Sequence, residues 1–400
     1  MRRALHPSRT LAYSGLLFST KAPPRFRRWS YQTVDAQPIE EQTLLGYKHK
    51  RYYPIKIGQT LKYRYRIIAK LGYGAYSTVW LTWDESTNQY ATVKVCIERE
   101  DVAESPIRNE IKTLQRMKNF ADTADHPGLC FTRLASDIFE VTSPQGRHYC
   151  IASKPQGHSL RELQRAFPDA KVPRLLVRSL ILRLLFSINW LHAICGLIHT
   201  DISPQNILTV LEDDSSLEYL EEQESVDPKL SGIPILTDFG QAREVQGINQ
   251  DWWMSDLYRA PEVLLGLPWS YAVDLWSVSV MTLELLEGKN LFDPIDRTYS
   301  QYVLPLALVQ YIGYLGPPPL YMIQKSPLFS TYFDEYGNWI SEPPIPQLSL
   351  ETFVTTIPPG EEKVLFLKFI RNLLTWDPDT MASANGSIPD EWLMRPNELI

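Results

Sequence analysis

HTDISPQN, residues 199–206, is the stretch of sequence that most strongly restricts the fold and the chemistry of this chain. It follows an apolar segment with helical spacing and places the amide of Asn206 five residues after the carboxylate of Asp201. A carboxylate in this position can accept the proton of a substrate hydroxyl group, while Asn206 can bind a metal ion. Taken alone, the same residues would also suit a helix cap or a turn.

A second polar segment, Asp238-Phe239-Gly240, follows the apolar residues Ile235 and Leu236. A carboxylate at the end of a buried strand is well placed to hold Mg²⁺ between the β- and γ-phosphates of a nucleotide. We therefore predict that Asp238 and Asn206 are metal ligands. This segment too could be a simple turn if it stood alone.

A glycine-rich segment, GYGAYSTV at residues 72–79, lies between two predicted strands. The backbone N–H groups of such a hairpin can approach phosphate groups. A plain hairpin turn would use Gly72 and Gly74 in the same way, and Ser77 stands where a third glycine is expected. The residues that follow this segment are needed to support its interpretation as a phosphate-binding loop.

Lys94 lies in ATVKV, residues 91–95, twenty positions after Gly74. In an alternating strand its ammonium group would point to the space under the glycine-rich segment. Glu110 lies on the next predicted helix, and an ion pair with Lys94 would hold the lysine against the α- and β-phosphates. An isolated strand lysine or helix glutamate is more often a solvated surface residue.

Length and composition restrict the class of protein. The chain has 400 residues, of which 44% are hydrophobic and 22% charged, and its 19 glycines and 30 prolines are scattered. These values predict two or three folding units and exclude collagen-like and wholly disordered classes. The net charge of −6 excludes a protein that coats nucleic acid by its overall charge.

The cysteines and the apolar runs give two further expectations. Cys96, Cys130, Cys150 and Cys195 show no C-x-x-C spacing, which predicts reduced thiols rather than disulfides or a zinc site. No run approaches the ~18–20 consecutive apolar residues that a membrane-spanning helix needs. We therefore expect no membrane span.

Hydrophobic periodicity divides the chain into a β-rich part and a helical part. Residues 63–95 predict three antiparallel strands, and 106–120 carry the stripe of an amphipathic helix. Apolar residues recur with helical spacing in four further segments: 175–194, 273–287, 301–315 and 361–375. Between them, about residues 211–232 form an acidic insertion, for which a solvated loop is expected and a contact with a basic partner is the alternative.

The first 45 residues differ in composition from the remainder. Seven basic residues and no acidic residue precede Asp35, interleaved with Ser, Leu and Phe. This is typical of a mitochondrial transit peptide, and a disordered basic tail would have a similar composition. We exclude residues 1–45 from the predicted fold.

The order and spacing of the polar segments resemble the protein kinase signature. The resemblance rests on the glycine-rich segment, Lys94, Glu110, Asp201, Asn206, Asp238 and Ala260-Pro261-Glu262. It covers about residues 60–395. Thr200, Ser77, LGPPP at 315–319 and LGYKHKRYYP at 45–54 narrow it to the SR protein kinase group, particularly its fungal branch.

This resemblance implies an α+β, bilobal protein kinase fold with ATP in the cleft between the lobes. A small β-rich N-lobe with one regulatory helix is expected at 60–155, and a larger α-helical C-lobe at 156–395. The implied catalytic residues are Asp201, Lys94 and Asn206, and the metal ligands are Asn206 and Asp238. The implied nucleotide-binding residues are Leu71, Gly72, Tyr73, Gly74, Ala75, Val79, Lys94 and Glu110.

The implied activity is transfer of the γ-phosphoryl group of Mg-ATP to Ser or Thr of protein substrates that are rich in Arg and Ser. No direct contact with nucleic acid is expected. The protein is expected to be a monomer. The resemblance implies the nucleus or cytoplasm, whereas the composition of residues 1–45 favours mitochondria.

Four departures from the family pattern leave alternatives open. Ser203 replaces a lysine that steadies the transferred phosphate, and Met381 replaces an arginine that pairs with Glu262. Lys154 replaces an acidic residue of the nucleotide pocket, and Thr200 replaces the arginine that receives an activating phosphate.

The first two departures support a pseudokinase scaffold as the alternative function. A small-molecule kinase of similar fold is a second rival, against which Ala260-Pro261-Glu262 and Asp274-Leu275-Trp276 argue by resemblance to peptide-binding kinases.

Overall fold

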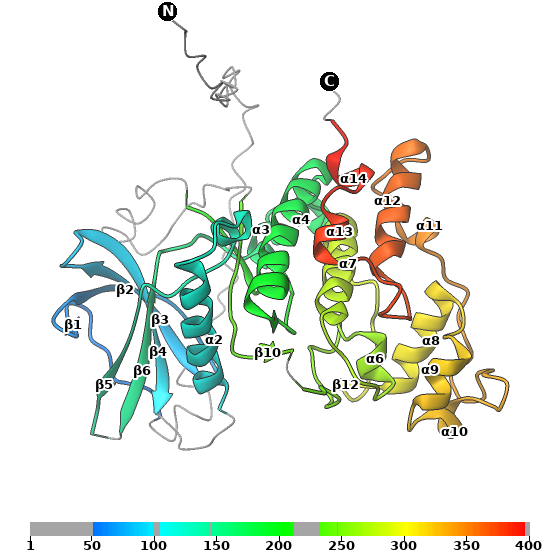
Figure 1. Cartoon of the computed structure of the whole chain (residues 1–400), viewed down its shortest axis with the longest axis horizontal. Helices are drawn as coiled ribbons and strands as arrows, with labels where there is room; N and C mark the ends of the chain where they lie inside the picture. Colours follow the sequence, from blue (N-terminus) through cyan, green and yellow to red (C-terminus); the bar gives the residue numbers. More distant parts are fainter. Residues whose placement is uncertain (1–50, 99–104, 145, 212–232, 246, 397–400) are drawn as a thin grey trace, which may run out of the picture. The chain divides into compact units, whose positions relative to one another are not determined.

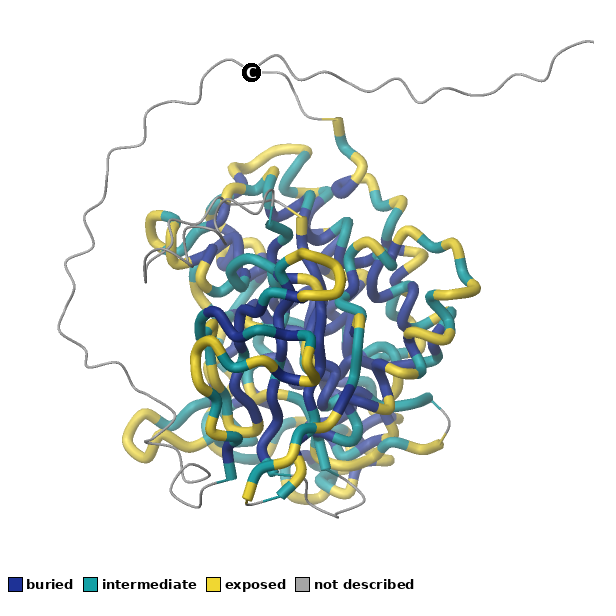
Figure 2. The backbone as a smooth tube through the Cα atoms, turned by 90° about the vertical axis from the view of Figure 1, so that its left-hand side faces the viewer, coloured by how far each residue is buried: buried dark blue, intermediate teal, exposed yellow. Residues whose placement is uncertain are grey.

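The computed structural model describes residues 51–98, 105–144, 146–211, 233–245 and 247–396 (Figure 1). These residues belong to one unit that is β-rich at its N-terminal end and helical beyond it, so the α+β, bilobal protein kinase fold is confirmed. The basic segment 1–45 and residues 212–232 of the acidic insertion lie outside the described residues. In Figure 2 the buried residues form the interior, and many of the exposed ones lie in connecting loops.

The N-lobe is built on an antiparallel sheet with strand order β1-β2-β3-β4-β6-β5. The strands are β1 (Thr60–Leu61), β2 (Tyr65–Gly74), β3 (Ser77–Asp84), β4 (Gln89–Glu98), β5 (Asp137–Thr142) and β6 (Arg147–Ser153). The three strands predicted within 63–95 are therefore confirmed as β2, β3 and β4. The sequence analysis identified neither β5 nor β6 as strands.

Alternation along β4 explains why one lysine faces away from the apolar core of the sheet. Val93 and Val95 pack into the apolar core on one face of the sheet. Because successive side chains of a strand point to opposite faces, Lys94 faces the other way. There it meets helix α2 (Pro106–Ala121), the predicted amphipathic helix.

Helix α2 places a single carboxylate on its buried face. Pro106 occupies its first turn, where the missing N–H costs nothing. The buried face carries Ile107, Ile111 and Leu114, and Glu110 lies among them with only 7% of its surface exposed. A buried carboxylate needs a partner, and Lys94 is the partner that the sheet supplies.

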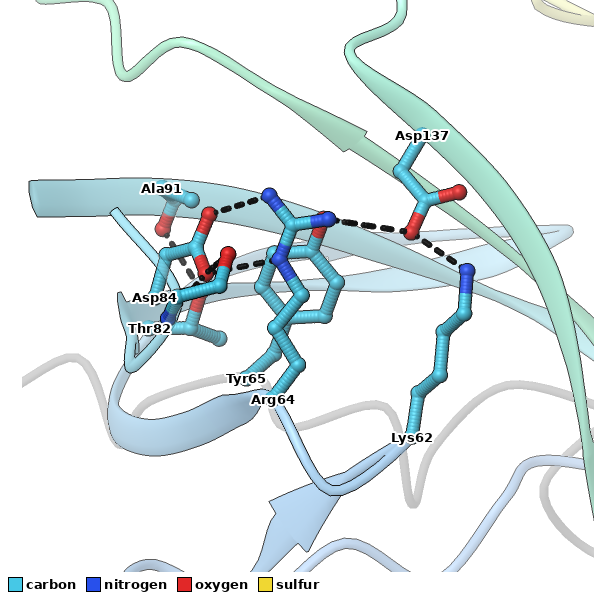
Figure 3. Close-up of polar contacts among 8 residues, drawn as sticks. Lys62, Arg64, Tyr65, Thr82, Asp84, Ala91 and Asp137 are labelled. Carbon is cyan, nitrogen blue, oxygen red and sulfur yellow. Dashed lines mark hydrogen bonds and ion pairs between the residues drawn. The ribbon is translucent and has the colours of Figure 1, made fainter. Parts of the chain in front are cut away.

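A cluster of charges closes the far end of the same sheet (Figure 3). Arg64 donates two hydrogen bonds to Asp84, at 2.7 and 2.6 Å, and its guanidinium lies 4.9 Å from the ring of Tyr65. Lys62 donates to Asp137 at 2.7 Å. The hydrogen bonds from Arg64 hold the pKa of Asp84 well below its usual range. Hydrogen bonds to charged groups stabilise a fold by about 1.5–3 kcal/mol, so the cluster fixes the β1–β2 turn to β3 and β5.

The C-lobe is mainly helical. Its helices are α3 (Leu160–Arg165), α4 (Arg174–Asn189), α6 (Pro261–Leu264), α7 (Ala272–Glu287), α8 (Leu304–Leu315), α9 (Leu320–Lys325), α10 (Phe329–Tyr332), α11 (Leu350–Phe353), α12 (Glu361–Leu373), α13 (Ala384–Ser387) and α14 (Glu391–Met394). The chain also has short 3₁₀ or π segments. Segment η2 (Pro127–Phe131) lies within the range of the N-lobe, and η3 (Pro168–Ala170) and η4 (Trp190–Cys195) belong to the C-lobe. The four predicted helical stripes correspond to α4 with η4, α7, α8 and α12.

Helix α8 begins three residues later than predicted. Gln301–Tyr302 forms strand β12 instead and pairs with β11 (Ile295–Asp296). Pro305 lies in the first turn of α8, and its fixed φ together with its missing N–H favours a helix start at this position. The apolar periodicity alone could not separate the strand from the helix.

Helix α4 and η4 together, Arg174–Cys195, are long and apolar enough to cross a membrane, with a mean hydropathy of 1.4. Their apolar residues, such as Leu180, Leu184 and Ile188, are instead fully buried in the C-lobe core. The core helix of a globular domain has the same composition. This segment is accordingly a core helix of the lobe.

Two short antiparallel strand pairs flank the polar segments. Strand β7 (Leu197–Ile198) pairs with β10 (Arg243–Glu244), and β8 (Ile207–Thr209) pairs with β9 (Pro234–Leu236). Residues 199–206 connect β7 to β8, and 237–242 connect β9 to β10. The two pairings bring segments that lie 30 or more residues apart in sequence to the same place in the fold.

Candidate active site

A buried aspartate on α7 fixes the backbone that carries Asp201. Asp274 is fully buried and accepts hydrogen bonds from the backbone N–H groups of His199 and Thr200, both at 2.8 Å. Nε2 of His192 lies 2.8 Å from the same carboxylate. Because a buried carboxylate is costly without partners, this arrangement has little freedom to change.

His199 holds the loop from the other side. Its Nδ1 accepts the backbone N–H of Asp201 at 3.2 Å, so Nε2 carries the proton and donates to the carbonyl oxygen of Thr237 at 2.9 Å. The ring also packs edge-on against Phe239. One imidazole thus links the segment around Asp201 to the segment around Asp238.

Asp201 and Asn206 are in direct contact. Nδ2 of Asn206 donates to Oδ2 of Asp201 and to its carbonyl oxygen, both at 2.8 Å. Burial raises the pKa of Asp201 above its usual value, although His199 and the hydrogen bonds from Asn206 and Ser255 act in the opposite direction. A carboxylate with a raised pKa is a better proton acceptor.

Lys94 lies between two carboxylates. Its Nζ is 2.7 Å from Oε2 of Glu110 and 3.8 Å from Oδ1 of Asp238. Burial alone would lower the pKa of Lys94, but Glu110 and Asp238 outweigh it and raise the pKa above its usual value. Lys94 in turn lowers the pKa of Asp238. Both shifts favour the charged forms, the ammonium of Lys94 and the carboxylate of Asp238.

A cavity of about 220 Å³ lies beneath the glycine-rich hairpin. Its lining includes Gly74, Ala75, Lys94, Glu110, Asp201 and Asp238. It therefore joins residues of both lobes. Leu71, Gly72, Tyr73 and Val79 belong to the same β2–β3 hairpin but do not line this cavity.

Steric packing within the protein does not require glycine at positions 72 and 74 of the hairpin. A Cβ atom added at Gly72 or Gly74 would meet nothing within 4 Å, and neither residue has a positive φ. Register shifts in β2 just before Gly72 bend this strand next to the cavity. Open space above backbone N–H groups fits the phosphates of a nucleotide, which need close approach to the backbone.

The fit to Mg²⁺ rests on Asn206 and Asp238. In the described part of the chain, no group of three or more His, Cys, Asp or Glu side chains is placed to hold a metal ion. One carboxylate and one amide are nevertheless typical of Mg²⁺ sites, in which phosphates and water supply the remaining oxygens. These two residues fit a metal that binds together with a nucleotide rather than one bound by protein alone.

A second cavity of about 410 Å³ shares Asp201 and Gln241 with the first. Its walls are formed by Thr200, Asp201, Gln241 and the segment Trp252–Ser255. Trp252 and Trp253 belong to none of the motifs that the sequence identified. No spacing rule could assign them to this wall, because they reach it through the fold of the segment between Asp238 and Glu262.

Three residues around the two cavities have strained backbones. Thr200, Asp238 and Met254 have φ values of 68°, 63° and 68°, a region that non-glycine residues rarely adopt. Such strain costs about 1–3 kcal/mol per residue and persists only where the surroundings enforce it. Among the described residues, nine non-glycine residues have a positive φ, and these three lie on the segments that carry the polar residues.

The departures from the family pattern have different surroundings. Ser203 is buried, whereas Lys154 is exposed. Glu262 is almost fully buried, and both of its carboxylate oxygens lack a hydrogen-bond partner in the described structure. Burial raises the pKa of Glu262 to about 7. Glu262 is therefore a buried carboxylate for which the described structure shows no hydrogen-bonded cation.

Comparison with known proteins agrees with this geometry. The protein kinase domain model matches residues 65–393. A serine/threonine protein kinase of Aspergillus fumigatus is 32% identical over 375 residues, which cover 90% of this chain and 92% of that protein. The serine/threonine-protein kinase SRPK of Physarum polycephalum is 27% identical, covering 88% and 91%.

A shorter match extends the comparison to animals. SRSF protein kinase 3 of Mus musculus is 32% identical over 176 residues, which cover 44% of this chain and 30% of that protein. With three carboxylates, the lysine and the glycine-rich hairpin assembled around one cavity, the chain belongs to the protein kinase family and is a serine/threonine protein kinase.

Proposed function

We propose that the chain transfers the γ-phosphoryl group of Mg-ATP to Ser or Thr side chains of Arg/Ser-rich proteins. The observation that carries the proposal is the convergence of Lys94, Glu110, Asp201 and Asp238 on one cavity. These are the groups that phosphoryl transfer needs for positioning and for charge stabilisation. The resemblance to SR protein kinases supplies the substrate class.

The roles follow from the contacts. Asp201 accepts the proton of the substrate hydroxyl, and Asn206 orients its carboxylate through the 2.8 Å hydrogen bond. Lys94, held by Glu110, binds the α- and β-phosphates, and the backbone from Leu71 to Ala75 with Val79 surrounds the nucleotide. Asn206 and Asp238 would hold Mg²⁺, which when bound neutralises charge on the phosphates.

Two observations support an Arg/Ser-rich substrate. The relatives include proteins named SRPK and SRSF protein kinase 3. In addition, Asp251 and Asp256 flank the wall Trp252–Ser255, and about half of each carboxylate side chain is exposed. They have arginine partners in the chain, Arg243 at 3.7 Å and Arg259 at 2.8 Å. Further basic side chains of a substrate are attracted to carboxylates of this kind.

The test is incubation with Mg-ATP and an Arg/Ser peptide. Wild type should phosphorylate this peptide faster than a matched Lys/Ser or Ala/Ser peptide, and Asp201→Asn should be inactive. A wild-type protein that binds Mg-ATP but phosphorylates no peptide would favour the pseudokinase alternative. Retention of Lys94, Asp201, Asn206 and Asp238 argues against that alternative.

The remaining parts of the proposal concern the state and location of the protein. We propose a monomer with lobes at 60–155 and 156–395 that contacts neither nucleic acid nor membrane. The composition of residues 1–45, which lie outside the described structure, favours mitochondria, whereas the resemblance to SR protein kinases favours the nucleus and cytoplasm. Fusion of residues 1–45 to a fluorescent protein distinguishes the two: a cleaved, mitochondrial fusion supports import, and a diffuse, uncleaved fusion contradicts it.

A further inference from the structure

The hydroxyl group of Thr200 joins three segments of the site. The indole Nε1 of Trp253 donates a hydrogen bond to Oγ1 of Thr200 at 3.0 Å. The same hydroxyl donates to the carbonyl oxygen of Gln241 at 2.9 Å. One side chain therefore connects the loop that carries Asp201, the residues after Asp238 and the segment before Glu262.

Thr200 needs such support because its backbone is strained. It is a β-branched residue with φ at 68°, a conformation that such residues rarely adopt. Asp274 holds its backbone N–H at 2.8 Å, and Trp253 and Gln241 hold its side chain. Asp201 is the next residue, so a relaxation of φ at Thr200 would displace the carboxylate of Asp201.

Trp253 is itself fixed from two directions. The guanidinium of Arg243 lies 3.7 Å from the centre of its ring, and Nε of Arg259 donates to its carbonyl oxygen at 2.9 Å. Arg243 belongs to β10, whose partner strand β7 ends one residue before His199. A cation stacked closely on an indole stabilises the position of the ring. The indole N–H thus reaches Thr200 from a supported position.

We propose that Trp253 is a positioning residue for Asp201, acting through the hydroxyl group of Thr200; this inference rests on the proposed phosphoryl transfer. In the family that the chain resembles, an arginine before the catalytic aspartate pairs with an added phosphate. Here an uncharged indole N–H makes the connection, and the cation Arg243 stacks on its ring. The connection is complete without a covalent modification.

The test compares single and double variants in steady-state kinetics with an Arg/Ser peptide. Trp253→Phe keeps a ring for Arg243 but removes the N–H donor, and Thr200→Val removes the acceptor. Each should lower kcat about 10- to 100-fold, the range that small displacements of a reacting group produce, and change the KM for ATP less than about twofold. The double variant should lose no more than either single variant, because both remove one interaction. Thr200→Ser, which keeps the hydroxyl, should retain wild-type kcat.

Trp339→Phe is the matched control. Trp339 is also half-buried, and its Nε1 donates to the carbonyl oxygen of Pro343 at 2.9 Å, away from both cavities. It should lose the same kind of hydrogen bond with unchanged kcat. A kcat of Trp253→Phe equal to that of the control, or losses that multiply in the double variant, would overturn the proposal.

Hydrogen exchange gives a second readout that does not depend on turnover. Trp253→Phe and Thr200→Val should speed amide exchange in residues 199–203, and Trp339→Phe should not. Unchanged exchange in that segment would overturn the proposal. If the wild type phosphorylates no peptide, the proposed function fails, and the exchange experiment decides the role of Trp253 separately. If Trp253→Phe does not fold, Thr200→Val carries both measurements.

Discussion

The ammonium nitrogen of Lys94 lies 2.7 Å from Oε2 of Glu110, and this ion pair connects strand β4 to helix α2 at the wall of the cavity under the glycine-rich hairpin. Lys94 is also 3.8 Å from Asp238, a residue of the C-lobe. The pair therefore links three separate segments. The role of the Lys94–Glu110 ion pair in phosphoryl transfer can be tested separately from its effect on folding.

Lys94→Met should lower kcat by about 10²-fold or more, because a preorganised charge on the phosphates is lost. The substitution also leaves Glu110 buried without its partner, which destabilises the fold. The double variant Lys94→Met/Glu110→Gln removes that unpaired charge and should regain thermal stability but not activity. Lys62→Ala is the control, because it breaks an ion pair of the same 2.7 Å length to Asp137, far from the cavity (Figure 3). Near-wild-type turnover in the double variant would contradict the role of Lys94.

Activity should not depend on phosphorylation of the segment between Asp238 and Glu262. Its hydroxyl side chains are those of Ser255 and Tyr258, and Tyr258 is buried and hydrogen-bonded to Glu284. Thr200 offers no cation to a phosphate on Ser255. Protein made in bacteria should keep its kcat within about twofold after phosphatase treatment, as checked by the peptide assay. A large loss that phosphorylation of Ser255 restores would refute this prediction.

Ser203→Lys should raise kcat. Lys94 is the single cation among the described residues that line the two cavities, so the transferred phosphate has little positive charge from the protein on the side of Asp201. One preorganised charge commonly changes a rate by ~10²–10³, and we expect a smaller gain because Ser203 is buried and the longer side chain must displace its neighbours. Ser203→Met is the uncharged control. An equal effect of Met and Lys, or no gain with Lys at constant nucleotide affinity, would show that the loop has adapted to serine.

The stability of the fold should depend on pH through Glu262. Below pH 4.5 this residue is protonated in both the folded and the unfolded state. Between 4.5 and about 7 the unfolded chain releases the proton while the folded chain keeps it, so stability falls as pH rises. Above about 7 the folded carboxylate ionises too, and the pH dependence ends.

Glu262→Gln removes this effect. Its advantage over wild type in the free energy of unfolding should grow by about 3 kcal/mol from pH 4.5 to 7, since each unit of pKa shift is worth ~1.4 kcal/mol. Met381→Arg should also stabilise the protein at pH 8 by supplying a cation. Denaturant unfolding of the three proteins at several pH values measures both effects. An advantage of Gln that stays constant between pH 5 and 8 would contradict the assignment to Glu262.

Local patterns in the sequence identified the segments that contain the candidate site residues. Asp201, Asn206 and Asp238 were identified because short loops after apolar strands or helices keep functional side chains at fixed spacing. Lys94 was placed correctly because alternation with Val93 and Val95 leaves it on the other face of β4. Glu110 followed from helical spacing with Ile107 and Leu114. In each case the information is local, within one strand, one helix or one loop.

Only the tertiary structure decided what these residues touch. The support of His199 and Thr200 by Asp274 spans more than 70 positions, and the hydrogen bond from Trp253 to Thr200 spans 53. Such contacts depend on the packing of α7 and on the path of the segment before Glu262, which no periodicity encodes. Strands β5 and β6 were missed although β-branched and aromatic residues occur in both; β6 pairs with β4 and with β5, and this order of neighbours is set by the tertiary structure.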